Sequence, residues 1–366
     1  MAATSLWRRV AGLLGGMLAA SGARAVDVPV DQAEAMVHVY QGGGVTASGP
    51  ALLVRKGLAE RVSLSGSYYI DAVSNASIDV VTTASPFKEK RTEYGLGVDY
   101  AVRDALITLS TSASREPDYD SGSVSLDVSQ ETFGGMTTVA LGYTRGADEV
   151  RKKDDPGFAE DVTRWQYRLG ITQILTPRWL ASANFEIVSE DGFLGSPYRA
   201  ARVFGAAVPE RNPSTRSSRS LKLRVIGDVG SGARTAVRGE YRYFWDTWDI
   251  RAHTTEFGVS RYFGDAWLAD AFLRLYSQSA ALFYSDNAPG ETTFVSRNRQ
   301  LSTFNSVGLG AKVSYTFKQV PGQYELKAHG SYELVQFKFK DFTDIRTGSP
   351  YAFNANVLQL FVSASF

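Results

Sequence analysis

The sequence predicts an all-β fold: a transmembrane antiparallel β-barrel of about 16 strands, with short periplasmic turns and long external loops. Three observations predict it. Apolar and polar residues alternate along most of the chain, long and short connections alternate between these segments, and no run of about 18 apolar residues could form a membrane helix. The hydrophobic fraction of 44% fits such a barrel, because every second residue of a spanning strand faces water.

The first residues predict export from the cytoplasm. Two arginines (residues 8–9) precede an apolar run over residues 10–20, and the small-x-small pattern "ARA" follows at residues 23–25. The apolar run is well short of the ~20 residues that a membrane helix needs. We therefore expect residues 1–25 to be a signal peptide and residues 26–366 to be an outer-membrane β-barrel, as found in Gram-negative bacteria.

Sixteen alternating segments are expected to form the strands. They lie near residues 36–43, 49–56, 60–73, 90–101, 104–115, 119–131, 133–146, 161–173, 178–189, 216–229, 233–246, 249–263, 266–281, 303–318, 323–339 and 354–366. An even number is typical of single-chain bacterial barrels. The last segment must pair with the first, because an open edge would leave backbone groups without hydrogen-bond partners in hydrocarbon.

The connections predict the topology. They are short after every even strand and often long after odd strands, and the long stretches are residues 74–89, 147–160, 190–215, 282–302 and 340–353. Outer-membrane barrels have short periplasmic turns and longer external loops. We therefore expect both termini in the periplasm, with the first strand running outward.

One long connection, residues 73–88, is unusually apolar for a loop in water. It carries a single acid among several apolar side chains, and the residues of interest are Ile78, Asp79, Val80, Val81 and Phe87. We expect this loop to fold into the mouth or lumen as a constriction. The alternatives are a longer hairpin and a patch that binds a partner.

Aromatic residues at the strand ends predict the membrane boundaries. Trp165, Trp179, Trp245 and Trp267 share the apolar side of the alternation, two near each end of the strands. Together with the final residue, Phe366, they are expected to form the aromatic girdle at the lipid–water boundaries. Outer-membrane barrels resemble one another in such a C-terminal aromatic residue, which implies recognition by the barrel-assembly machinery.

The polar side of the alternation carries many charges, which a wet lumen tolerates and a packed core does not. The expected pore-lining residues are Arg55, Asp71, Glu93, Asp99, Asp127, Arg164, Arg168, Lys222, Arg224, Arg238, Glu240, Arg242, Asp270, Arg274, Lys312, Glu325, Lys327 and Glu333. The eighth to thirteenth strands are mostly basic and the others mostly acidic, which predicts a transverse field across a channel. The alternative is that these charges only form cross-strand ion pairs that stiffen the wall.

Five stretches resemble a known family: "YQGGGVTASGPALLVRK" (40–56), "SIDVVTTASPFKEKRTEYGLGVDY" (77–100), "YTRGADEV" (143–150), "YRYFWDTWDIRAHTTEFGVSRY" (241–262) and "RLYSQSAALFYSD" (274–286). They are similar to the uncharacterised bacterial outer-membrane barrels of domain-of-unknown-function family 3570. The resemblance implies a β-barrel and export, and no activity is assigned to the family. It also implies a periplasmic lipoprotein or redox partner, in a surface redox or export system.

Composition excludes several other classes of protein. There is no cysteine, hence no disulfide framework or thiolate metal site, and the formal net charge of +1 gives no reason to expect nucleic-acid binding. Two acidic loop clusters, near residues 116–120 and 154–161, could hold calcium or bridge lipopolysaccharide, although solvated loop charge is the favoured interpretation. The basic stretch with Arg211, Arg216 and Arg219 could meet anionic headgroups of the outer leaflet. We expect no metal and no cofactor.

We do not expect an enzyme. The chain has 3 histidines, and neither Gly-x-Ser-x-Gly nor His-Glu-x-x-His occurs. His253 lies near Asp249 and could act as a base, whereas a hydrogen bond in the lumen is the simple interpretation of His329. The most favoured function is a porin-like channel for small polar solutes. The alternative is a non-transporting barrel that serves as a scaffold or docking sleeve for a periplasmic or surface partner.

Overall fold

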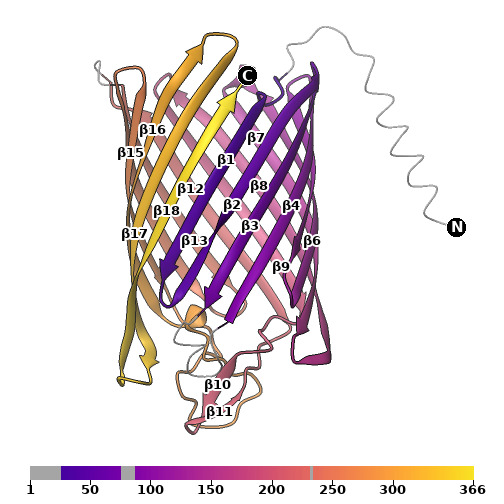
Figure 1. The fold of residues 1–366 in the computed structure, drawn as a ribbon, viewed down its shortest axis with the longest axis vertical. Helices are drawn as coiled ribbons and strands as arrows, with labels where there is room; N and C mark the ends of the chain where they lie inside the picture. Colours follow the sequence, from indigo (N-terminus) through magenta and orange to yellow (C-terminus); the bar gives the residue numbers. More distant parts are fainter. Residues whose placement is uncertain (1–25, 76–86, 231–233) are drawn as a thin grey trace, which may run out of the picture.

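The computed structural model describes residues 26–75, 87–230 and 234–366, so the expected signal peptide lies outside the described residues. Sixteen antiparallel strands form one closed barrel, which confirms the predicted fold class (Figure 1). A separate two-stranded sheet lies beyond one end of the barrel. No helix within the described residues is long and apolar enough to cross a bilayer.

The barrel strands follow one another around the wall in chain order. They are β1 (Gln32–Gly42), β2 (Val45–Ala59), β3 (Val62–Asn75), β4 (Phe87–Val102), β5 (Ala105–Arg115), β6 (Tyr119–Thr132), β7 (Thr137–Lys152), β8 (Asp155–Thr176), β9 (Trp179–Gly192), β12 (Thr215–Asp228), β13 (Thr235–Asp246), β14 (Arg251–Phe263), β15 (Trp267–Gln278), β16 (Phe304–Val320), β17 (Tyr324–Asp344) and β18 (Ser349–Ser365). The separate sheet pairs β10 (Ala200–Val203) with β11 (Ala206–Pro209).

The alternation in the sequence places apolar side chains on the outer face, as predicted. In β16, Val307, Leu309 and Val313 are exposed on the outside of the barrel, whereas Lys312 points inward and lies over the ring of Phe361. The same pattern recurs in β12, where Leu221 and its alternate neighbours are exposed. Because successive side chains of a strand point to opposite faces, the same strands form an apolar outer face and a polar inner face.

The predicted pairing of the last strand with the first is confirmed. β18 and β1 are antiparallel neighbours from Gln32 opposite Ser365 to Gly42 opposite Ala355. The N–H of Phe366 then donates to the carbonyl of Asp31 at 3.0 Å, and the Lys56 ammonium lies 4.9 Å from the centre of the Phe366 ring. No strand of the barrel is left with an open edge.

The two ends of the barrel differ. We call the end with the short turns and residue 366 the turn end, and the opposite end, where the long connections lie, the loop end (Figure 1). Two stretches expected as long loops are instead hairpins: β7 runs to Lys152 before β8 begins at Asp155, and β17 runs to Asp344 before β18 begins at Ser349. Paired strands satisfy their own backbone groups, so they continue past the apolar part of the wall.

The other two long connections within the described residues fold together into what we call the cap, residues 193–214 and 279–303. Val203 of β10 forms a parallel bridge with Ala288, and Arg211 an antiparallel bridge with Val295. A small apolar core around Ala201, Val203, Ala288 and Val295 holds the two segments together. The sequence did not predict β10, β11 or this association.

Candidate functional site

A cavity of about 450 Å³ lies at the loop end, between the inner wall of the barrel and the cap, and we call it the chamber. Strands β6 to β9 and β12 to β15 supply its wall, and the cap and the β13–β14 turn supply its cover. Among its lining residues are Tyr119, Arg164, Glu190, Arg216 and Arg242 on the wall side and Leu194, Trp248 and Leu301 on the cover side. Both sides mix polar and apolar groups, because the wall also carries Val150 and Phe244 and the cap also carries Asn212 and Gln300.

The apolar residues of the cover belong to a second small core. Trp248, Ile250, Ala281 and Leu301 are buried together, with Leu194 and other partly buried apolar residues packed against them. The N–H of Leu282 donates to the carbonyl of Trp248 at 2.8 Å, so the cap and the β13–β14 turn form one continuous cover.

Asp246, the last residue of β13, fixes the shape of this cover. Its carboxylate accepts hydrogen bonds from the N–H groups of Trp248 at 3.0 Å and Ile250 at 2.9 Å, and forms an ion pair with Arg216 at 2.5 Å. The Arg216 guanidinium also stacks over the Trp248 ring at 4.5 Å. One carboxylate therefore ties the wall to the cover and holds a guanidinium at the edge of the chamber.

The other two arginines of the chamber wall, Arg164 and Arg242, differ in how closely acidic side chains approach them. Arg164 forms ion pairs with Asp148 at 2.9 Å and with Glu190 at 3.1 Å. Arg242 lies 4.0 Å from Glu186, the longest ion pair on this wall. Of Arg164, Arg216 and Arg242, Arg242 is therefore the arginine whose guanidinium is best able to interact with a solute in the chamber.

The cap is also attached to the opposite side of the barrel mouth. Arg297 is buried, and its Nη2 donates to the carbonyl of Thr343 at 2.6 Å while forming an ion pair with Asp286 at 2.8 Å. The guanidinium stacks on Phe342 at 4.3 Å. These contacts join the cap to the β17–β18 hairpin across the loop end.

A partly buried tyrosine adds a second attachment to the same hairpin. The Tyr284 hydroxyl donates to the carbonyl of Asp341 at 3.0 Å. Burial raises the pKa of the Tyr284 phenol, and the charge of Asp341 raises it further, so the group stays a hydrogen-bond donor.

The predicted pore-lining residues lie on the inner face, and each has a side-chain partner. Every one of those named above takes part in an ion pair, hydrogen bond or cation–π contact. Ion pairs between strands, on which the alternative interpretation depends, are therefore present. The transverse field stays a prediction.

A chain of four charges runs along the middle of this wall. Arg238 binds Glu256 at 2.8 Å, Glu256 binds Arg274 at 3.0 Å, and Arg274 binds Glu333 at 3.0 Å. The last pair reaches across β16 at Gly308, where a Cβ would lie 2.9 Å from the Glu333 carboxylate. The missing side chain of a glycine therefore lets charges two strands apart meet.

Several acids of this network were missed by the sequence analysis. Asp148, Glu190, Asp246 and Glu256 all lie on the inner face and neutralise arginines of the strands predicted to be basic. The parity of the alternation could have found Glu256, because its neighbour Phe257 is an exposed residue of the outer face.

Four of the five predicted constriction residues lie outside the part of the chain that the structure describes, and the fifth lies in a strand. Ile78, Asp79, Val80 and Val81 lie outside the described residues, and Phe87 is the first residue of β4, opposite Asn75. The segments that cover the loop end, within the parts of the chain that are described, come from two different connections, those of the cap.

The predicted girdle residues lie on the outer face in two groups. Trp165 and Trp245 are at the loop end of β8 and β13, and Trp179 and Trp267 begin β9 and β15 at the turn end. Trp179 covers Gly227 of β12, where a Cβ would lie 2.3 Å from the indole ring. Phe366 is exposed at the turn end.

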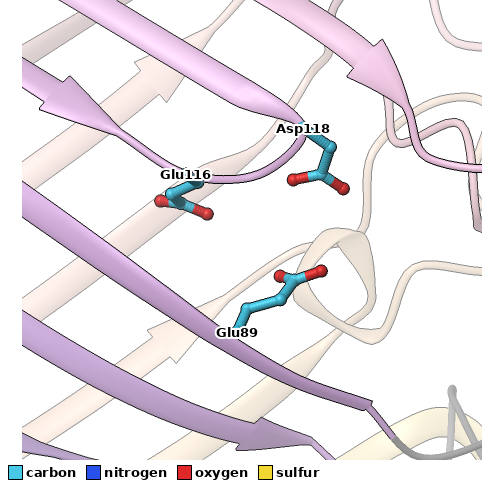
Figure 2. A group of neighbouring side chains, drawn as sticks. All are labelled: Glu89, Glu116 and Asp118. Atoms are coloured by element: carbon cyan, nitrogen blue, oxygen red, sulfur yellow. The ribbon is translucent and has the colours of Figure 1, made fainter. Parts of the chain in front are cut away.

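Of the two acidic loop clusters, one forms a compact group with a residue that the sequence analysis did not consider. The carboxylates of Glu89, Glu116 and Asp118 point toward one another at the loop end, with oxygens all within 4.8 Å (Figure 2). Burial raises the pKa of Glu116, and the charge of Asp118 adds to this against the opposing charge of Arg91. The trio has the ligand type of a calcium site and no further feature that indicates a bound ion.

Each of the three histidines lies within hydrogen-bond distance of a neighbouring side chain. His253 faces outward, where its Nδ1 lies 2.7 Å from the Tyr241 hydroxyl, and Asp249 pairs with Arg251 instead. His329 lies between Ser314 at 2.8 Å and Ser363 at 3.0 Å on the inner face. His38 binds Asp71 at 2.6 Å, also on the inner face.

The closed barrel with an apolar outer face and a charged inner face defines an outer-membrane-type β-barrel fold, and this fold implies a location in the outer membrane. The chain belongs to the family described as "Protein of unknown function (DUF3570)", whose model matches residues 19–332. The predicted family is thereby confirmed. No curated protein matches the chain.

Solved structures are similar to the chain at low sequence identity, and one of them has a TM-score above 0.5. A bacterial polysaccharide outer membrane secretin has a TM-score of 0.55 at 10% identity, over 91% of this chain and 98% of that one. The siderophore receptor PirA from Pseudomonas aeruginosa has a TM-score of 0.48 at 10% identity, over 87% of this chain and only 60% of that one. OmpT, an outer membrane protein of Vibrio cholerae, has a TM-score of 0.48 at 8% identity, over 93% and 100%.

Proposed function

We propose that the protein is a porin-like channel for small polar solutes, with the loop end outside the cell and both termini in the periplasm. In this proposal, solutes cross the barrel by way of the chamber, and the cap restricts their size. The orientation is supported by the short turns at one end and the cap at the other, as in other outer-membrane barrels.

One observation carries this proposal: water reaches charged side chains in the middle of the barrel. The side chain of Asp127 is 43% exposed and that of Arg274 is 42% exposed, although both point inward. A barrel of sixteen strands encloses more space than its own side chains fill, unless a loop fills it. An interior wetted at mid-height and covered at one end fits a narrow channel.

Planar-bilayer recordings test the channel. The N–H of Gly192 donates to the carbonyl of Ser214 at 2.9 Å, so the first cap segment leaves and re-enters the wall at adjacent points. A short Gly-Ser turn can therefore replace residues 194–212 without stretching the barrel. We expect discrete, small conductance steps from the unmodified protein and steps several-fold larger from this variant. Silence of both proteins at all voltages, with the fold verified by circular dichroism, would contradict the proposal.

A docking sleeve is the second candidate, and the surface of the cap favours it. Phe204 is 73% exposed and Leu282 is 82% exposed, although both lie on connections at the loop end. Exposed large apolar side chains on loops in water often mark a contact with another protein. If the sleeve is correct, a Phe204→Ser/Leu282→Ser variant should lose a partner that co-purifies with the unmodified protein, while its own thermal unfolding stays unchanged.

A further inference from the structure

The outer face at the loop end carries three tryptophan–arginine neighbours. One of them, Trp245 with Arg251 of β14, differs from the other two because Arg251 forms an ion pair with Asp249 at 3.2 Å. In the other two, Arg145 of β7 lies directly opposite Trp165 of β8, and Arg219 of β12 lies directly opposite Trp245 of β13. β9 runs between the two pairs, with Ser189 opposite Trp165 and Ile187 opposite Arg219. The four side chains therefore belong to one continuous stretch of the outer wall.

The alternation fixes the direction of these side chains. Tyr143 and Leu141 share the outer face of β7 with Arg145, and Leu221 and Leu223 share that of β12 with Arg219. Tryptophan in a membrane protein is enriched at the depth of the lipid headgroups. Arginines directly opposite these tryptophans lie at the same depth, on the lipid side of the wall.

The two arginines differ from the arginines of the inner face. Within residues 26–75, 87–230 and 234–366, neither Arg145 nor Arg219 has an acidic, hydrogen-bonding or aromatic cation–π partner, whereas Arg164, Arg168 and Arg238 each bind a carboxylate. Arg145 is exposed and Arg219 is half-buried. A cation at the membrane boundary is stabilised by an anion, and phosphate matches the planar fork of a guanidinium.

We propose that Arg145 and Arg219 bind the phosphate groups of a phosphorylated glycolipid of the outer leaflet. Its acyl chains lie along the apolar outer face nearer the middle of the wall, where Tyr143, Tyr167 and Leu169 are exposed. Tyr143 and Tyr167 pack against each other, with ring centres 5.4 Å apart, and give these chains a continuous surface. The proposal rests on the orientation proposed above and is independent of whether the barrel conducts.

Native mass spectrometry of the purified full chain, titrated in detergent with bisphosphorylated lipid A, tests the proposal. We expect the unmodified protein to retain this lipid at least tenfold more tightly than the dephosphorylated form. An Arg145→Gln/Arg219→Gln variant should lose this preference, and an Arg145→Lys/Arg219→Lys variant should keep part of it because the charge remains.

Arg261→Gln is the matched control. Arg261 also faces outward, but it lies at the turn end and stacks on Phe263 at 5.4 Å. Equal retention by the double glutamine variant and the unmodified protein would overturn the proposal. So would an equal loss in the Arg261→Gln control, or retention of phosphatidylglycerol as tightly as of the phosphorylated glycolipid. Planar-bilayer conductance of the same variants is measured separately, so failure here leaves the channel proposal standing.

Discussion

Arg168 of β8 donates a hydrogen bond of 2.8 Å to Asp127 of β6, although β7 lies between the two strands. Gly142 of β7 is directly opposite both residues and has no side chain to separate them. A Cβ at this position would lie 2.2 Å from the Asp127 carboxylate and 2.7 Å from Nε of Arg168. The glycine is therefore required for the ion pair rather than for a turn.

Gly142→Ala should break this ion pair and destabilise the barrel by about 1 kcal/mol, the upper range for a partly exposed pair. Urea unfolding in detergent micelles measures the change. In a double-mutant cycle with Asp127→Asn, the two substitutions should not be additive, because both remove the same interaction. Gly239→Ala is the control, since a Cβ there meets nothing within 4 Å. An equal cost for both alanine variants would contradict the assigned role.

Asp246→Asn should loosen the cover of the chamber. The Asp246 side chain is 0% exposed and holds Arg216 as well as two backbone N–H groups of the adjacent turn. Loss of its charge leaves a half-buried guanidinium without its partner, and we expect a cost of about 2 kcal/mol in the free energy of unfolding. Trp248 fluorescence during urea unfolding reports the change, because this indole lies against Arg216.

The matched control for this substitution is Asp265→Asn. Asp265 also pairs with an arginine, Arg234 at 2.7 Å, but its side chain is 101% exposed. Exposed pairs contribute about 0–1 kcal/mol, so the control should be close to neutral. A similar cost in both variants would mean that burial does not decide the strength of the Asp246 contacts.

Arg297→Ala should weaken the attachment of the cap to the β17–β18 hairpin, which the hydrogen bond of Tyr284 to Asp341 still maintains in part. The substitution removes the contacts with Thr343, Asp286 and Phe342, while the bridges between the two cap segments remain. We expect larger or more frequently fluctuating conductance in planar bilayers. Arg346→Ala is the control, because Arg346 binds Asp344 within the same hairpin and, among the described residues, forms no hydrogen bond or ion pair with the cap. Indistinguishable recordings from both variants would show that this attachment does not limit the current.

Glu116→Gln should change how stability depends on pH. The pKa of Glu116 is raised in the folded state, so the folded chain binds a proton more readily than the unfolded chain there. The contribution of the Glu116 carboxyl group to the free energy of unfolding is therefore greatest at low pH, and it falls as the pH rises through the raised pKa. The glutamine variant should melt at a higher temperature than the unmodified protein at pH 7.5, with the difference vanishing near about pH 4.

Asp118→Asn should also raise the melting temperature at pH 7.5. The substitution removes a negative charge that raises the pKa of Glu116, so Glu116 ionises in the folded state at a smaller cost. Circular dichroism melts across this pH range measure both variants. A pH profile of Glu116→Gln that parallels that of the unmodified protein would show that Glu116 is not the titrating group.

The strands were predictable because the two faces of the wall meet different solvents. Every second residue of β16 must be apolar to face lipid, and the residues between them are free to be Gly, Lys or Ser, so the period is visible in the sequence. The positions of β7 and β17 were predictable for the same reason, but their lengths were not. Beyond the apolar band both sides of a hairpin face water, and the alternation no longer carries a signal.

The cap was not predictable, because its contacts are not periodic. Val203 and Ala288 are bridged partners far apart in the sequence, and nothing around either residue indicates the other. The candidate site depends on this association, since Leu301 and Trp248 reach the chamber from separate connections. The ion pairs of the inner face could not be predicted from the sequence either, because partners such as Arg168 and Asp127 belong to strands that are not neighbours.

The ion pairs across a glycine have a consequence for how the barrel is assembled. Backbone hydrogen bonds are equivalent along a strand, so a slip of two residues between neighbours preserves the ladder and keeps apolar side chains outside. Such a slip of β7 against β6 or β8 would move one partner by about 6.6 Å and separate Asp127 from Arg168. Barrels that assemble with a shifted register would therefore contain charged side chains without partners. The ion pairs thus favour the correct register over other registers that form the same number of backbone hydrogen bonds.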